Sequence, residues 1–230
     1  NLNILKYKKH VVFFDVGSPP KKNYSRAYQC GPLSFEYFNE KKKIITNCGF
    51  GYNISKKGML LSRLTSAQST LSINDTTVLK FERNKIINKA FGNLIKSSFK
   101  VFDINFLDDE TKTASEATHD AYETSKGYIH KRIIKIDKQN EKFVGCDKLI
   151  KKKDSQPIKY DIRFHLTPGI EAVQTMGGNS ILIKLNKNKS LIFSSKNELI
   201  SVEKSIFLGG NKILNNLCIS ITGNLSNENK

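Results

Sequence analysis

Several features that would assign a protein to a class are missing from this chain of 230 residues. No apolar run is long enough to cross a bilayer, and no apolar stretch typical of a signal peptide lies at the start. The four cysteines, Cys30, Cys48, Cys146 and Cys218, are far apart and form no CxxC pair. Their spacing excludes a zinc ribbon and argues against a dense disulfide framework, so we expect small buried thiols.

Negative charge is scarce relative to positive charge. The chain has 38 Lys and Arg residues against 21 Asp and Glu, which gives a formal net charge of +17 at pH 7. This excess of positive charge favours binding of any polyanion, whether nucleic acid, anionic lipid or acidic polysaccharide. The charge alone does not distinguish among these partners. No RNP-type aromatic motif and no zinc finger is present, so nucleic-acid binding rests on charge alone and no specific nucleic acid is expected.

A sustained apolar period of 3.6 residues is also absent. Short β-type runs bounded by turn residues recur instead, at 11–17, 32–38, 42–48, 69–75, 97–106, 127–136, 142–150, 160–166, 180–185, 190–195 and 217–223. The pattern predicts an all-β, mostly antiparallel fold. The length suits one domain over residues 1–230, with a frayed tail at 226–230.

Two predicted strands place polar side chains on defined faces. Within 160–166, Arg163 and His165 share the face opposite the apolar residues, because side chains alternate along a strand. Within 127–136, His130 and Arg132 lie on one face together.

The turn KQNE, residues 138–141, permits a prediction of strand register. If the turn closes symmetrically, counting outward from it places Arg132 directly opposite Asp147. Opposite charges at such a position stabilise a sheet by about 0.2 to 1 kcal/mol. A structural ion pair therefore explains this pair as well as a functional role does.

Eight sequence blocks carry a family resemblance. They are DVGSPP (15–20), SRAYQCGPLSFE (25–36), ITNCG (45–49), SRLTSAQSTLSINDTT (62–77), ATHDAY (117–122), GYIHKR (127–132), GCD (145–147) and IRFHLTP (162–168). In this order they resemble the C-terminal domain of heparinase II/III-like proteins. The resemblance implies a layered antiparallel β-sandwich that follows an N-terminal α/α toroid. Because the chain begins with Asn, we expect an internal or C-terminal piece that lacks this toroid.

The resemblance also implies an activity. Family members are polysaccharide lyases that cleave uronic-acid-containing chains, so we expect an acidic polysaccharide as partner and the bacterial cell envelope or periplasm as location. In β-elimination a base removes the C5 proton, an acid protonates the leaving oxygen at C4, and the uronate carboxylate is neutralised. In the family much of this machinery lies on the toroid. The chain alone is therefore expected to be inactive.

Candidate site residues follow from the matching blocks. The catalytic candidates at an interdomain cleft are His119, Tyr122 and Arg63, and the substrate-binding candidates are Tyr28, Gln68, Arg163 and His165. His119 is expected outside the regular strand, as a ligand or proton carrier, whereas His130 and Arg132 are explained by strand pairing. The expected result of His119→Ala is lower turnover with little loss of stability.

Two departures from the family pattern keep alternatives open. Gln68 and Tyr28 stand where many relatives have histidine, and Gln cannot titrate as an acid or base. Three alternatives remain open: a lyase with an altered mechanism, a lyase for another polyanion, and a member that binds glycan without cleaving it. The rival from a different class is a non-catalytic β-sandwich that binds polyanionic glycan or packs against a partner domain.

Some family members hold a structural metal in this domain, so the resemblance raises the question of a divalent ion such as zinc or calcium. The matching positions are Gln68, Asp75 and His119. Gln is a poor zinc ligand beside His or carboxylate. The alternative is that His119 and Asp120 form hydrogen bonds across a loop.

Overall fold

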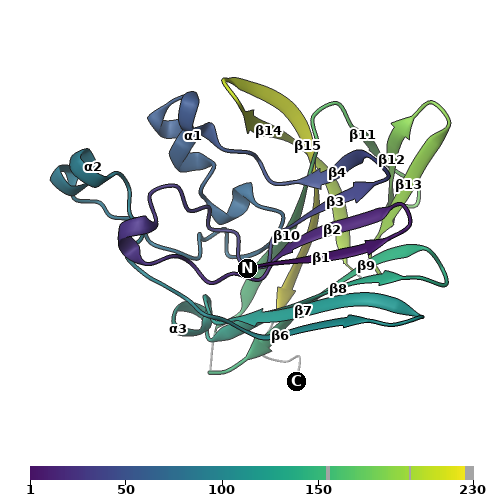
Figure 1. Ribbon diagram of the computed structural model, residues 1–230, viewed down its shortest axis with the longest axis horizontal. Helices are drawn as coiled ribbons and strands as arrows, with labels where there is room; N and C mark the ends of the chain where they lie inside the picture. Colours follow the sequence, from purple (N-terminus) through teal and green to yellow (C-terminus); the bar gives the residue numbers. More distant parts are fainter. Residues whose placement is uncertain (154–155, 197, 226–230) are drawn as a thin grey trace.

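The computed structural model describes residues 1–153, 156–196 and 198–225. The expected frayed tail, 226–230, lies outside the described residues. Within them the chain is built from antiparallel sheets with a few short helices (Figure 1). The predicted all-β antiparallel fold is confirmed.

The largest sheet has eight strands. Its path is β1-β2-β3-β4-β10-β15-β14, and β5 pairs with β10 off this path. The strands are β1 (Leu2–Tyr7), β2 (His10–Asp15), β3 (Phe35–Asn39), β4 (Lys42–Thr46), β5 (Leu71–Ile73), β10 (Ile158–Leu166), β14 (Leu199–Gly209) and β15 (Lys212–Leu225).

Two smaller sheets complete the fold. One has the order β6-β7-β8-β9 and the other the order β11-β12-β13. Their strands are β6 (Val101–Asp108), β7 (Lys112–His119), β8 (Tyr128–Asp137), β9 (Lys142–Lys151), β11 (Glu171–Gln174), β12 (Ser180–Asn186) and β13 (Lys189–Ser194).

The helices are short and lie in the connections between strands. They are α1 (Lys56–Leu61), α2 (Lys85–Phe91), α3 (Glu123–Lys126), and the 3-10 turns η1 (Lys22–Tyr24), η2 (Gly51–Asn53) and η3 (Thr65–Ala67). Figure 1 shows α1 and α2 on the left and the three-stranded sheet on the right. No helix among the described residues is long and apolar enough to span a membrane.

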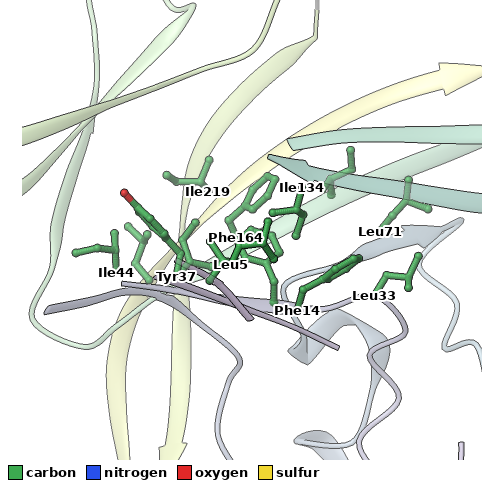
Figure 2. Close-up of a cluster of buried hydrophobic side chains, with 14 of the residues drawn as sticks. Leu5, Phe14, Leu33, Tyr37, Ile44, Leu71, Ile134, Phe164 and Ile219 are labelled. Atoms are coloured by element: carbon green, nitrogen blue, oxygen red, sulfur yellow. The ribbon is translucent and has the colours of Figure 1, made fainter. Parts of the chain in front are cut away.

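The core lies between the large sheet and the four-stranded sheet (Figure 2). Phe143 of β9 packs edge-on against Phe35 at 5.5 Å between ring centroids and stacks on Tyr37 at 4.7 Å. Ile134 of β8 and Phe164 of β10 belong to the same cluster, so strands of both sheets contribute apolar side chains to it. Burial of these faces holds the two layers together.

The structure decides two expectations from the sequence, the register of the 138–141 hairpin and the burial of the cysteines. The symmetric turn is present, and Arg132 lies opposite Asp147 as predicted. All four cysteines are free, but Cys146 is exposed, so the expectation of buried thiols is wrong at that position. Cys146 lies opposite Ile133 in the register of β8 and β9, and its side chain is therefore on the outer face of the four-stranded sheet.

Candidate functional site: a buried polar network and an open polar pocket

The two histidines of the 117–136 segment lie side by side inside the protein. His119 is the last residue of β7 and pairs directly with His130 of β8. The expectation that His119 lies outside the regular strand is therefore wrong. The inward side chains of β7, whose sequence is KTASEATH, are small. The strand therefore lacks the alternation of large apolar and polar residues that usually predicts a strand.

A continuous chain of hydrogen bonds runs from His119 to Arg132. His119 Nε2 is 3.0 Å from His130 Nδ1, and His130 Nε2 is 2.6 Å from Asp147 Oδ1. Arg132 donates from Nε to Asp147 Oδ1 at 2.7 Å and from Nη2 to Oδ2 at 3.1 Å. At the other end, the backbone N–H of Ala121 donates to His119 Nδ1 at 3.2 Å. Each imidazole thus accepts at Nδ1 and donates at Nε2, so both are neutral.

Burial and charge explain this protonation state. His119 and His130 are fully buried, and desolvation lowers the pKa of each. Burial alone would raise the pKa of Asp147, but the Arg132 charge and the His130 hydrogen bond outweigh it and hold that pKa well below its usual range. The network therefore contains one buried ion pair and two neutral imidazoles.

Arg132 also joins the two layers of the sandwich. Its Nη1 donates to the carbonyl oxygen of Leu33 at 2.8 Å and to that of Ser69 at 2.9 Å. Both acceptors lie in loops that lead into strands of the large sheet, β3 and β5, whereas Arg132 belongs to β8. The network ties the four-stranded sheet to these loops. His119, His130 and Arg132 are buried within it, whereas the Asp147 side chain is 9% exposed.

The other two catalytic candidates are buried as well. Tyr122 donates its hydroxyl to the carbonyl oxygen of Leu71 at 3.1 Å, and burial raises its pKa. Arg63 is fully buried and donates to three backbone carbonyls, those of Tyr28 (2.8 Å), Asn93 (2.6 Å) and Ser25 (2.8 Å). In this arrangement neither side chain is accessible to a polymeric substrate.

Two substrate-binding candidates lie on β10. Arg163 is partly exposed and pairs with Asp75 at 3.2 Å. His165 is buried; its Nε2 is 3.0 Å from the carbonyl oxygen of Ser66, and its Nδ1 lies 3.2 Å from Cys48 Sγ and 3.3 Å from Ser205 Oγ. Of these two, only Arg163 has surface to offer a ligand.

Of the remaining two candidates, Gln68 lies at an open pocket of about 660 Å³, whereas Tyr28 is not among the lining residues of that pocket. Gln68 follows η3, lines this pocket and donates from Nε2 to the carbonyl oxygen of Ser62 at 2.7 Å. The half-buried Tyr28 packs against a small second core that contains Cys30 and Phe99, and burial raises its pKa.

The pocket lies at the end of the large sheet where β1 and β3 begin and β2 and β4 end. It is lined by Asn1, Leu2, Phe13, Asp15, Gln29, Ser34, Phe35, Glu36, Asn47 and Gln68. Sequence reasoning named only Gln68 among these. The signal was nevertheless present, since Asp15, Gln29, Glu36 and Asn47 all fall inside the blocks that carry the family resemblance.

Comparison with known families and folds agrees with this architecture. The model of the family described as "Heparinase II/III-like, C-terminal" matches residues 1–230, the whole chain. The chain belongs to this family. The sequence blocks that suggested it are thereby confirmed as a guide to membership.

Two solved structures share the fold of this heparinase II/III-like domain. Heparan sulfate lyase HepC from Pedobacter heparinus has a TM-score of 0.72 at 15% identity, over 95% of this chain and 31% of that protein. Heparinase III has a TM-score of 0.70 at 15% identity, over 99% of this chain and 33% of that protein. Both confirm the β-sandwich.

A curated relative from a different context also matches. FtsZ-localized protein C from Caulobacter vibrioides is 26% identical over 200 residues, which cover 84% of this chain and 34% of the relative. The heparinase II/III-like domain thus spans about one third of the length of the proteins that it matches.

The metal expectation finds no support in the geometry. No group of three or more His, Cys, Asp or Glu side chains that could hold a metal ion occurs in the described part of the chain. Asp75 pairs with Arg163, and His119 is hydrogen-bonded to His130. Asp120 instead accepts from the backbone N–H of Lys100 at 2.7 Å.

Acidification should destabilise the domain as the pH falls from about 6.5 to about 4. Burial lowers the pKa of His165 from 6.5 to about 4 and also lowers the pKa values of His119 and His130. In this range the unfolded chain binds protons that the native state does not. The free energy of unfolding therefore decreases as the pH falls, by about 3 kcal/mol from His165 alone. Urea unfolding measured across this range tests the expectation.

A matched variant assigns the effect. His165→Gln should reduce the pH dependence by the share of His165, while His119 and His130 still contribute theirs. Asp15 and Asp161 have raised pKa values, so their protonation favours the native state as the pH falls. Their contribution to stability changes at pH values close to the ordinary carboxyl pKa. A free energy of unfolding that stays constant between about pH 6.5 and 4 would contradict neutral buried histidines.

Proposed function

We propose that this chain is the C-terminal β-sandwich of a polysaccharide lyase that cleaves uronic-acid-containing glycans by β-elimination. The observation that carries the proposal is the family match over the whole chain, together with the fold shared with a heparan sulfate lyase. The chain's net charge of +17 is consistent with an acidic polysaccharide. The bacterial cell envelope or periplasm is the proposed location.

The burial of the candidate residues defines what this domain contributes. Elimination needs a base at C5 and an acid at the leaving oxygen, each within hydrogen-bond reach of the substrate. His119, Tyr122 and Arg63 bond to other parts of the protein and are at most 1% exposed. We therefore assign the proton transfers to an N-terminal toroid. This domain contributes the open pocket and the partly exposed Arg163 as contacts for the substrate.

The test compares two forms of the protein. The full-length protein should produce unsaturated uronate ends from heparan-type or other uronate glycans, recorded by their absorbance, whereas residues 1–230 alone should produce none. The control for the short form is its folding, checked by circular dichroism. Elimination by residues 1–230 alone would overturn the division of labour, and no product from the full-length protein across a broad panel of glycans would overturn the lyase.

A non-catalytic glycan-binding domain is the second candidate. The observation that favours it is the presence of Gln68, which cannot titrate, among the residues that line the pocket, at a position where the family resemblance implies histidine. In that case the full-length protein would bind uronate glycans without changing their length. The same panel separates the two functions, because binding without new unsaturated ends would favour this candidate.

A further inference from the structure

The open pocket has a composition that differs from the rest of this basic protein. Its ten lining residues include two carboxylates and four side-chain amides but no Lys, Arg or His. Among the described residues, no cationic side chain lines this pocket that could bind the carboxylate of a uronate or a sulfate group. Its volume of about 660 Å³ is ample for one or two sugar rings, since small-molecule pockets range over about 300–1,000 Å³.

The two carboxylates of the pocket are not equivalent. Glu36 accepts from Lys43 Nζ at 2.7 Å and from the Thr46 hydroxyl at 3.2 Å, so its charge is balanced. Asp15 accepts from the backbone N–H of Gly17 at 2.9 Å through Oδ1, and no side-chain ion pair of Asp15 occurs among the described residues. Burial raises its pKa, as expected for a carboxylate without a cationic side chain beside it. Asp15 therefore has no cationic side chain paired with it among the described residues, and the positive charge that acts on it is that of the N-terminus at Asn1.

The amides leave both donors and acceptors for a ligand. Asn47 uses Oδ1 to accept from the backbone N–H of Ser69 at 2.8 Å, while its Nδ2 makes no hydrogen bond to the described residues. Gln29 is partly exposed and bonds through Nε2 to the backbone carbonyls of Gly49 and Ser62, which leaves its side-chain oxygen as an acceptor. Gln68 is 1% exposed and bonds through Nε2 to the same carbonyl of Ser62, so it supports the wall of the pocket. A sugar hydroxyl both donates and accepts, so it matches such a set, and an ammonium or acetamido N–H matches the acceptors.

An apolar surface adjoins these polar groups. Phe13 lines the pocket from the outward face of β2 and makes an edge contact with Phe38 of β3 at 5.7 Å between ring centroids. Leu2 and Ile4 of the neighbouring β1 are 54% and 51% exposed. The C–H face of a pyranose ring can pack on such a surface while its hydroxyls reach the amides.

We propose that this pocket binds a neutral or amino sugar unit of the glycan, through Asp15, Asn47 and the Gln29 oxygen, and excludes the uronate carboxylate. The inference deepens the proposed function and rests on it for the identity of the ligand as a glycan. The uronate unit then lies outside the pocket, toward the basic remainder of the surface.

Two isosteric variants in the full-length protein test the pocket. Asp15→Asn keeps the acceptor for the Gly17 N–H but removes the charge, and Asn47→Asp keeps the acceptor for the Ser69 N–H but removes the donor and adds a charge. The probes are the trimers of glucosamine, N-acetylglucosamine and galacturonic acid, titrated by calorimetry. Glu171→Gln, a carboxylate on β11 that is 71% exposed and lies outside the pocket, is the charge-matched control.

The expected pattern is specific to charge. Asp15→Asn should weaken binding of the cationic glucosamine trimer about tenfold, because a charge-assisted hydrogen bond is lost, while Glu171→Gln should leave it unchanged. Asn47→Asp should weaken binding of the neutral trimer. Absence of binding to both amino-sugar trimers, or affinities that neither pocket variant alters, would overturn the inference. Pocket binding without lyase activity would instead refute only the proposed function.

Discussion

Replacing Arg132 by alanine should lower the free energy of unfolding by about 3–5 kcal/mol, which is the cost of removing one partner of a buried ion pair. The variant leaves the buried carboxylate of Asp147 without its cation and the carbonyls of Leu33 and Ser69 without their donor. Urea unfolding at neutral pH measures the loss. Arg132→Lys should recover only part of it, because an ammonium cannot reproduce the two-pronged contact.

The neighbouring residue provides the control. Lys131 lies on the opposite face of β8, is partly exposed and pairs with Glu116 at 2.8 Å. Lys131→Ala should cost less than about 1 kcal/mol, as is usual for a surface ion pair. If Arg132→Ala cost no more than Lys131→Ala, the buried network would not be a main support of the sandwich.

Arg63→Met should lower the free energy of unfolding by about 2–4 kcal/mol. The variant keeps an apolar stem but removes three charge-assisted hydrogen bonds, to the carbonyls of Tyr28, Asn93 and Ser25. It also removes the contact of the guanidinium with the Phe81 ring, whose centroid is 4.6 Å away. Burial lowers the pKa of Arg63, because its charge is poorly solvated inside the protein. The loss of unfolding free energy is therefore smaller than the sum of three separate charge-assisted hydrogen bonds.

The loss should be local as well as global. Amide hydrogen exchange should increase first in the 25–30 and 93–95 segments, which Arg63 holds together. Arg83→Met is the matched control, because Arg83 is exposed, and it should change stability by less than about 0.5 kcal/mol. Unchanged exchange in both segments would mean that the carbonyl contacts of Arg63 do not hold this region.

The fold was predictable from the sequence where the pattern is local. Alternating apolar residues mark β8, β9 and β10, and the symmetric turn at 138–141 predicts the pairing of Arg132 with Asp147 that the structure has. β7 was missed because its inward positions are Thr113, Ser115 and Ala117, which are too small to give an apolar alternation.

The site was predictable only in part. The sequence singled out Arg63 and His119, but their burial depends on residues distant along the chain, such as Asn93 and His130. The pocket is assembled from several separated segments, so no spacing along the chain could bring Asp15, Asn47 and Gln68 together. Local patterns report strands and turns, whereas accessibility is a property of the packed structure.

Heavy-oxygen water provides the most direct test of the central claim that this domain belongs to an eliminating lyase. Full-length protein is incubated with a uronate glycan in such water, and the products are weighed by mass spectrometry. β-Elimination breaks the C4–oxygen bond without adding water, so each new non-reducing end should carry a double bond, each new reducing end should keep the former glycosidic oxygen, and the cleavage should add no solvent oxygen. One heavy oxygen gained for each cleaved bond would indicate hydrolysis, and an uncleaved glycan would indicate a binding domain; either result would contradict the proposed function.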